Sequence, residues 1–169
     1  MLFRSEAEAF VSCGNAEPGG SLRITAPIAF TRLHIAPHLP NFIKEYPSLS
    51  IDLVATDAIL DIVKEGIDLA IRIAELEDSS LVARKLAPCR RLFCASPAYL
   101  KEHGEPKTLK ELDNHRILVE SHQTWKLHGP EGEITVKPTG DIKTNSSEII
   151  QQGVASGLGI ALCSTWLVR

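Results

Sequence analysis

Three short segments place hydroxyl or amide side chains where a predicted strand gives way to a predicted helix. They are "TAP", which begins at Thr25, "ATD", which contains Thr56, and "KTNSS", which contains Asn145. The first backbone N–H groups of a helix lack partners and carry partial positive charge, so such a junction suits an anion or a carboxylate. An ordinary helix cap without a ligand also explains each segment when it is taken alone.

Each of these segments carries residues that are common at helix caps. We expect Thr25 at or next to an N-cap, with Pro27 in the first turn, because proline has no N–H that would need a partner. We expect Thr56, together with Asp57, to cap the next helix, and Asn145 to cap a later one. Since three caps follow three strand ends, their side chains are predicted to converge on one ligand cleft.

Arg72 adds a fixed positive charge near the end of the largely apolar segment "IDLAIRI". A guanidinium without a partner in apolar surroundings is costly, so Arg72 needs a partner. That partner is either a protein carboxylate, such as Asp68 or Glu75, or the carboxylate of a ligand. The sequence leaves both alternatives open.

The elements that position these residues follow from the spacing of the apolar side chains. The three predicted strands are "LRITA", "LSIDLVA" and "IDLAIRI". The segments between them have helical periodicity: a first helix over about residues 30–45, kinked at Pro37, and a second one over residues 58–66. Strands that alternate with helices in this way predict a parallel sheet.

A second set of elements begins near residue 91. It consists of a strand at "RLFCA", a helix capped by Ser96 with Pro97 at its first position, a short helical piece at "TLKELDNH", a strand at "RILVE", a hairpin turning at "GPEG", a strand at "GDIKT", a helix opening at "NSSEII" and a strand at "GIALCS". The fold class is therefore α/β with two small lobes. The predicted divisions are a linker helix remnant over residues 1–19, a first lobe over 20–88 and a second lobe over 89–169.

Composition excludes several classes of protein. The 169 residues are 44% hydrophobic, and the chain has 18 Lys and Arg against 21 Asp and Glu, a net charge of −3. No apolar run approaches the ~18 residues that suggest a membrane span. The charge balance gives no basic footprint for a phosphate backbone, so the chain is not expected to grip DNA itself. The N-terminus does not resemble a secretory signal, which favours a cytoplasmic location.

Residues that bind metals or catalyse reactions form no convincing group. The four cysteines never form a C-x-x-C pair and are expected to be free, structural thiols: Cys13, Cys89, Cys94 and Cys163. His34 and His38 have helical spacing, but no Glu stands between them in the H-E-x-x-H pattern, and Pro37 disturbs the helix. A G-x-S-x-G elbow and a Gly-rich phosphate loop are both absent. The sequence therefore predicts no metal, no cofactor and no enzyme.

Several motifs between Gly20 and Arg169 carry a family resemblance: "EYP", "EGIDLAIR", "CASPAYL", "HG" and "GLGIAL". Together they closely resemble the effector-binding domain of LysR-type transcriptional regulators. The resemblance implies two lobes similar to the type II periplasmic-binding-protein fold, with a small polar or anionic effector held between them. Carried over by position, the effector contacts are Thr25, Ala26, Pro27, Thr56, Arg72, Asn145 and Ser146. Trp125 lies where such proteins often place a residue near the cleft, although a packing role in the second lobe is the preferred interpretation.

The resemblance also has implications for the binding partners of the chain and for both of its ends. Family members begin with a winged helix-turn-helix, so DNA binding is expected only through a domain that this chain lacks. Members also continue past the position of Arg169, so we expect the fold to be C-terminally incomplete. A homodimer or tetramer is expected through the first lobe. The alternative is a solute-binding protein of a transport system, against which the missing secretory signal argues.

Overall fold

The computed structural model describes residues 18–74, 79–121, 124–129 and 132–168, and the chain divides into two compact units, residues 1–79 and 80–169. The predicted linker helix over residues 1–19 lies outside the described residues except for its last two positions. In the described part of the chain, no helix is long and apolar enough to cross a membrane.

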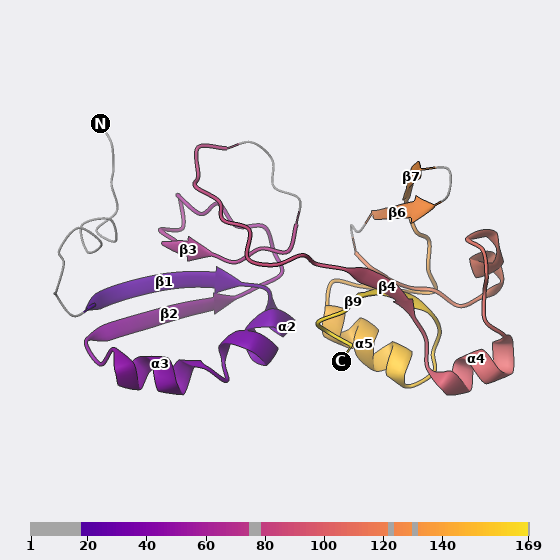
Figure 1. Ribbon diagram of the computed structural model, residues 1–169, viewed down its shortest axis with the longest axis horizontal. Helices are drawn as coiled ribbons and strands as arrows, with labels where there is room; N and C mark the ends of the chain where they lie inside the picture. Colours follow the sequence, from indigo (N-terminus) through magenta and orange to yellow (C-terminus); the bar gives the residue numbers. More distant parts are fainter. Residues whose placement is uncertain (1–17, 75–78, 122–123, 130–131, 169) are drawn as a thin grey trace. The chain divides into compact units, whose positions relative to one another are not determined.

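The first unit contains a three-stranded parallel sheet, as predicted. Its strands are β1 (Gly20–Ala26), β2 (Leu49–Ala55) and β3 (Leu69–Ala70), in the order β2-β1-β3. All three point the same way in Figure 1. The end of the central strand β1 is buried on both faces, since Ile24, Thr25 and Ala26 are consecutive buried residues. β3 is much shorter than the seven-residue strand expected from the sequence.

The first predicted helix is present and interrupted near Pro37. It consists of α2 (Ile28–Phe30), a π-helical stretch η1 (Thr31–Ile35) and α3 (Leu39–Glu45). The backbone N–H of Ala36 donates to the carbonyl of Thr31 at 2.8 Å, a five-residue step, and residues 36–38 form a turn. Because Pro37 has no N–H, the regular helix cannot continue through it.

The prediction of a second helix, over residues 58–66, is wrong. The segment forms a turn over residues 62–66, in which the Asp61 carboxylate accepts a hydrogen bond from the Lys64 N–H at 3.1 Å. Ile59 and Val63, two of the apolar residues that suggested the helix, are 99% and 75% exposed. A helix of this length depends on packing for its stability, and these side chains bury too little surface to supply it.

The second unit matches the predicted elements closely. They are β4 (Arg91–Cys94), α4 (Pro97–His103), the 3₁₀-helix η2 (Lys110–Asn114), β5 (Leu118–Glu120), β6 (Trp125–Gly129), β7 (Gly132–Val136), β8 (Ile142–Thr144), α5 (Ser147–Ala155) and β9 (Ala161–Ser164). β6 and β7 form the predicted antiparallel hairpin, β4 pairs antiparallel with β9, and β5 pairs parallel with β8. The Ser96 hydroxyl caps α4 by accepting from the Tyr99 N–H at 3.2 Å, and Pro97 follows it, both as predicted.

Alternating residues of β5 and β9 build two cores in the second unit. One cluster contains Leu118, Ala161, Cys163 and, from α5, Ile150 and Val154. The other contains the sequence neighbours Ile117, Val119, Ile160 and Leu162 with Tyr99, Leu112 and Trp125. Since successive strand residues point to opposite faces, this division indicates that α5 covers one face while the other cluster packs on the opposite one. Figure 1 shows α5 alongside β9.

Two glycines allow α5 and the segment that follows it to pack closely on residues 116–118. A Cβ atom at Gly153 would lie 2.5 Å from Cδ2 of Leu118, and one at Gly159 would overlap the backbone oxygen of Arg116. Gly157, between them, has φ of +78° and follows the end of α5. The "GLG" segment is therefore required for the turn and for the packing.

Candidate functional site at the ends of the first sheet

The register of the first sheet brings four of the predicted contact residues to one edge. Thr25 pairs with Val54 of β2 and with Ala70 of β3, so the three strands end side by side. The ladders continue beyond the strands, because the Thr56 N–H donates to the Ala26 carbonyl at 2.9 Å and the Ile71 N–H donates to the Thr25 carbonyl at 2.8 Å. Residues that follow the strands, including Thr56 and Arg72, therefore lie at the edge where β1 ends.

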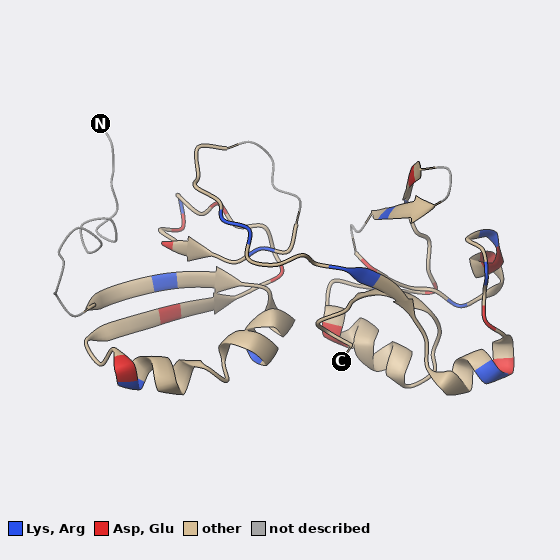
Figure 2. Cartoon of the chain, in the orientation of Figure 1, with Lys and Arg blue, Asp and Glu red and all other residues tan. Residues whose placement is uncertain are grey.

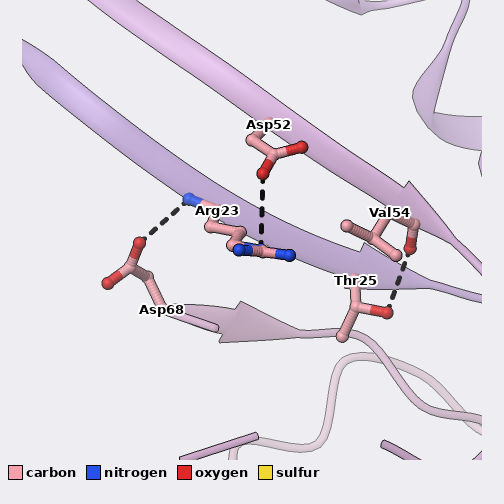
Figure 3. Close-up of polar contacts among 5 residues, drawn as sticks. All are labelled: Arg23, Thr25, Asp52, Val54 and Asp68. Atoms are coloured by element: carbon pink, nitrogen blue, oxygen red, sulfur yellow. Dashed lines mark hydrogen bonds and ion pairs between the residues drawn. The ribbon is translucent and has the colours of Figure 1, made fainter. Parts of the chain in front are cut away.

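Thr25 is fully buried, and its hydroxyl has partners on both sides. Oγ1 donates to the Val54 carbonyl at 3.0 Å, and it accepts from Nη2 of Arg72 at 3.0 Å. Figure 3 shows the bond to Val54 between β1 and β2. Thr25 does not cap a helix, since the N-cap position of α2 is Pro27, which makes no side-chain cap bond. The role of its hydroxyl is to join two strands and to hold Arg72.

Arg72 is half-buried and is held at the strand ends by neutral oxygen atoms. Besides the Thr25 hydroxyl, its Nη1 donates to the Ile71 carbonyl at 3.2 Å. Burial lowers the pKa of the Arg72 guanidinium, and the negative charge of Asp57 opposes that shift. Of the alternatives from the sequence, Asp68 has a different role, because its Oδ2 accepts from the Arg23 N–H at 2.9 Å (Figure 3). Glu75 lies outside the described residues.

Arg23 and its partners fix the register of the strands that carry this edge. The Asp68 N–H donates back to the Arg23 carbonyl at 3.0 Å, so residue 68 is hydrogen-bonded to β1 in both directions. Nε of Arg23 lies 3.3 Å from the Asp52 carboxylate on β2 (Figure 3). These contacts lie two residues before Thr25 and set the position of β3 and hence of Arg72.

Asp57 also lies at this edge, but it does not cap a following helix as the sequence predicted. Its Oδ1 accepts a hydrogen bond from the Ile28 N–H at 3.2 Å, so it serves the start of α2 and not of a following helix. Thr56, its neighbour, accepts from the Ala58 N–H at 3.1 Å through Oγ1, which closes a local turn. The available signal was a carboxylate two residues after the end of an apolar strand, but its partner is 29 residues away.

The second unit holds Asn145 and Ser146 at the start of α5. Ser146, not Asn145, is the N-cap: its hydroxyl accepts from the Ile149 N–H at 3.4 Å, while its own N–H donates to Oγ1 of Thr144 at 3.2 Å. The predicted Asn145 cap is therefore wrong by one residue. Asn145 is exposed and precedes the helix. Both residues are good caps, and the extended backbone at Ser146 decides between them.

Trp125 has the packing role that the sequence favoured. It is 4% exposed, belongs to the core that contains Tyr99 and Ile160, and meets the ring of Phe93 edge-on, with centroids 5.2 Å apart. Among the residues that the structure describes, no three His, Cys, Asp or Glu side chains gather as metal ligands. Cys89, Cys94 and Cys163 are free thiols, and Cys13 lies outside the described residues.

Comparison with known proteins decides the family. The model of the LysR substrate binding domain matches residues 15–169. The chain belongs to this family. It is 40% identical over 154 residues to the HTH-type transcriptional regulator DmlR of Escherichia coli K12, and 35% identical over 154 residues to the transcriptional activator TtdR of the same strain. Each match covers 88% of this chain and 50% of the relative, so the chain spans about half the length of these relatives.

Solved structures agree with this assignment to the LysR family. The regulatory domain of CrgA, a LysR-type transcriptional regulator from Neisseria meningitidis, has a TM-score of 0.77 and 31% sequence identity, covering 89% of this chain and 76% of that one. The regulatory domain of an AphB variant from Vibrio vulnificus has a TM-score of 0.75 and 27% identity, covering 89% and 77%. The chain is thus a LysR effector-binding domain, and its relatives are regulators of transcription and not solute-binding proteins of transport systems.

Proposed function

We propose that this LysR domain binds a small polar or anionic effector and thereby controls a DNA-binding regulator. The proposed contacts are the seven residues named from the sequence: Thr25, Ala26, Pro27, Thr56, Arg72, Asn145 and Ser146. The observation that carries the proposal is Arg72, a half-buried cation held by the Thr25 hydroxyl at the carboxyl ends of parallel strands. Ligands of open α/β sheets bind at such ends.

The roles within this proposal differ from residue to residue. Thr25 and Ala26 are 0% exposed, so they act by shaping the backbone and by positioning Arg72. Among the proposed contacts of the first unit, Pro27, Thr56 and Arg72 are partly exposed and can touch an effector directly. An anionic group gains about 1.5–3 kcal/mol from a charged hydrogen bond of the kind that Arg72 offers.

Arg72→Gln tests the proposal, because glutamine keeps donor atoms but loses the charge. A thermal-shift screen of small carboxylic acids, sugar acids and amino acids against the protein would supply ligands, and calorimetry would compare the parent with the variant. We expect the variant to bind roughly ten- to a hundredfold more weakly than the parent. Equal affinities of the two proteins for every ligand that the screen yields would contradict the proposal.

DNA binding and assembly belong to the same proposal. Along the part of the chain that the structure describes, Lys and Arg are interspersed with Asp and Glu (Figure 2), a distribution unlike the clustered basic residues of DNA-binding surfaces. DNA would be bound through a helix-turn-helix domain, in the cytoplasm, by a homodimer or tetramer. Support for assembly through the first unit comes from Phe42 and Ile43 of α3, each 39% exposed, and from β2, an edge strand of the described sheet. Sedimentation as a monomer at high concentration would count against assembly.

A further inference from the structure

Asp57 places a carboxylate of the protein beside the groups that the proposed function assigns to an effector. Its Oδ1 accepts from the Ile28 N–H at 3.2 Å, at the residue that follows Pro27. The nearby Arg72 donates to Thr25, three residues before Ile28 on the same segment. A negative side chain and a positive side chain are therefore both attached to the four residues that end β1 and begin α2.

The electrostatic relation between the two side chains agrees with this placement. Asp57 is the charge that favours the protonated guanidinium of Arg72 against the effect of burial on its pKa. Nη1 of Arg72 donates to the Ile71 carbonyl and Nη2 donates to the Thr25 hydroxyl, both of which are neutral oxygens. Asp57 therefore acts on the guanidinium through its electrostatic field. An anion that approached Arg72 would meet the repulsion of the Asp57 carboxylate.

We propose that Asp57 is an internal competitor for the effector: it occupies the Ile28 N–H and partly offsets the positive field of Arg72 until an anionic ligand displaces it. The inference rests on the proposed function and adds to it a regulatory residue at the same site. An effector gains only the difference between its own contacts and those of Asp57, which sets the ligand concentration at which the domain responds. Asp57 is thus a residue that tunes affinity and excludes weakly binding anions.

Asp57→Asn separates competition from a merely structural role. Asparagine keeps a side-chain oxygen that can accept from the Ile28 N–H, so the turn is preserved, while the negative charge is lost. Asp61→Asn is a matched control, because Asp61 also accepts a backbone hydrogen bond, from the Lys64 N–H at 3.1 Å, and loses the same charge. Loss of an exposed charge interaction changes a binding energy by up to about 1 kcal/mol, or roughly fivefold in affinity.

Malonate is a suitable probe, with its uncharged diamide as the ligand control. Titration of the ¹⁵N-labelled protein, followed through the amide signals, measures the affinity and reports on Ile28. We expect Asp57→Asn to bind malonate up to about fivefold more tightly than the parent, Asp61→Asn to bind like the parent, and the diamide to show no such gain. Malonate binding that is no tighter in Asp57→Asn, or absent from it, would overturn the inference, and so would an equal gain in Asp61→Asn.

A second variant distinguishes failure of this inference from failure of the proposed function. Adding Arg72→Gln to Asp57→Asn should remove the gain in malonate affinity. If Arg72→Gln alone weakens binding while Asp57→Asn leaves it unchanged, the effector site stands and Asp57 is only a turn residue. If Arg72→Gln changes nothing in either background, the proposed function itself is wrong about the site.

Discussion

The Thr25–Arg72 hydrogen bond can be measured by a double-mutant cycle. Thr25→Val keeps the shape of a fully buried side chain and removes the hydroxyl that donates to Val54 and accepts from Arg72, both at 3.0 Å. A typical hydrogen bond contributes about 1 kcal/mol, and an unpaired buried carbonyl costs about 1–3 kcal/mol. Arg72 is only half-buried, and in Thr25→Val its guanidinium can bind water instead of the lost hydroxyl. The loss of this hydrogen bond therefore adds less to the cost than the loss of the bond to Val54. We expect Thr25→Val to lower the free energy of unfolding by about 1–3 kcal/mol.

The cycle isolates the contribution of Arg72 from the rest of this loss. Urea unfolding of the parent, Thr25→Val, Arg72→Met and the double variant should show a coupling energy of about 0.5–1 kcal/mol between the two sites. Thr25→Ser is the matched control, since serine keeps the hydroxyl, and its cycle with Arg72→Met should be additive within about 0.5 kcal/mol. Additivity in both cycles would refute the hydrogen bond as the device that positions Arg72.

Three further predictions follow from the second unit. Gly159→Ala should destabilise it by about 1–3 kcal/mol in urea unfolding, because the new Cβ would overlap backbone, whereas at Gly129 the nearest atoms lie 3.9 Å away and alanine should change little. Ser146→Ala should cost about 1 kcal/mol as the loss of an N-cap, while Asn145→Ala should cost less than about 0.5 kcal/mol; equal losses would contradict the observed cap. Burial raises the pKa of Cys163 to about 12, so a thiol reagent should leave it unmodified at mildly alkaline pH until the protein unfolds. Because its folded pKa lies above the unfolded value of 9.0, stability contributed by the protonated thiol is lost as pH rises from about 9 to 12, which unfolding measured across that range would detect.

Local signals in the sequence predicted much of the fold. Ser96 and Pro97 mark the N-cap and the first residue of α4. The runs of apolar side chains at β5 and β9 predicted strands whose consecutive residues are buried, and these residues belong alternately to the two core clusters. The helix over residues 58–66 was mispredicted because its apolar spacing says nothing about what packs against it, and Ile59 and Val63 turned out to be exposed.

The chemistry of the candidate site was less accessible from the sequence. The strand ends and Arg72 were identified correctly as neighbours, because parallel strands end at one edge of a sheet. The partners were not: the Thr25 hydroxyl faces Val54 and Arg72, and Asp57 reaches the Ile28 N–H across 29 residues. Contacts of that sequence separation depend on register and on side-chain rotamers, which composition and periodicity do not encode.

We propose above that this LysR domain binds its effector at the carboxyl ends of the first sheet, around Arg72. The most direct test is chemical-shift mapping on the ¹⁵N-labelled protein with a ligand from the carboxylate screen. We expect the largest shifts on residues 25–28, 56–57 and 71–72, and we expect Arg72→Gln to need a roughly ten- to hundredfold higher ligand concentration to show them. Shifts confined to α3 or to the core around Trp125, with the sheet edge unchanged, would contradict it.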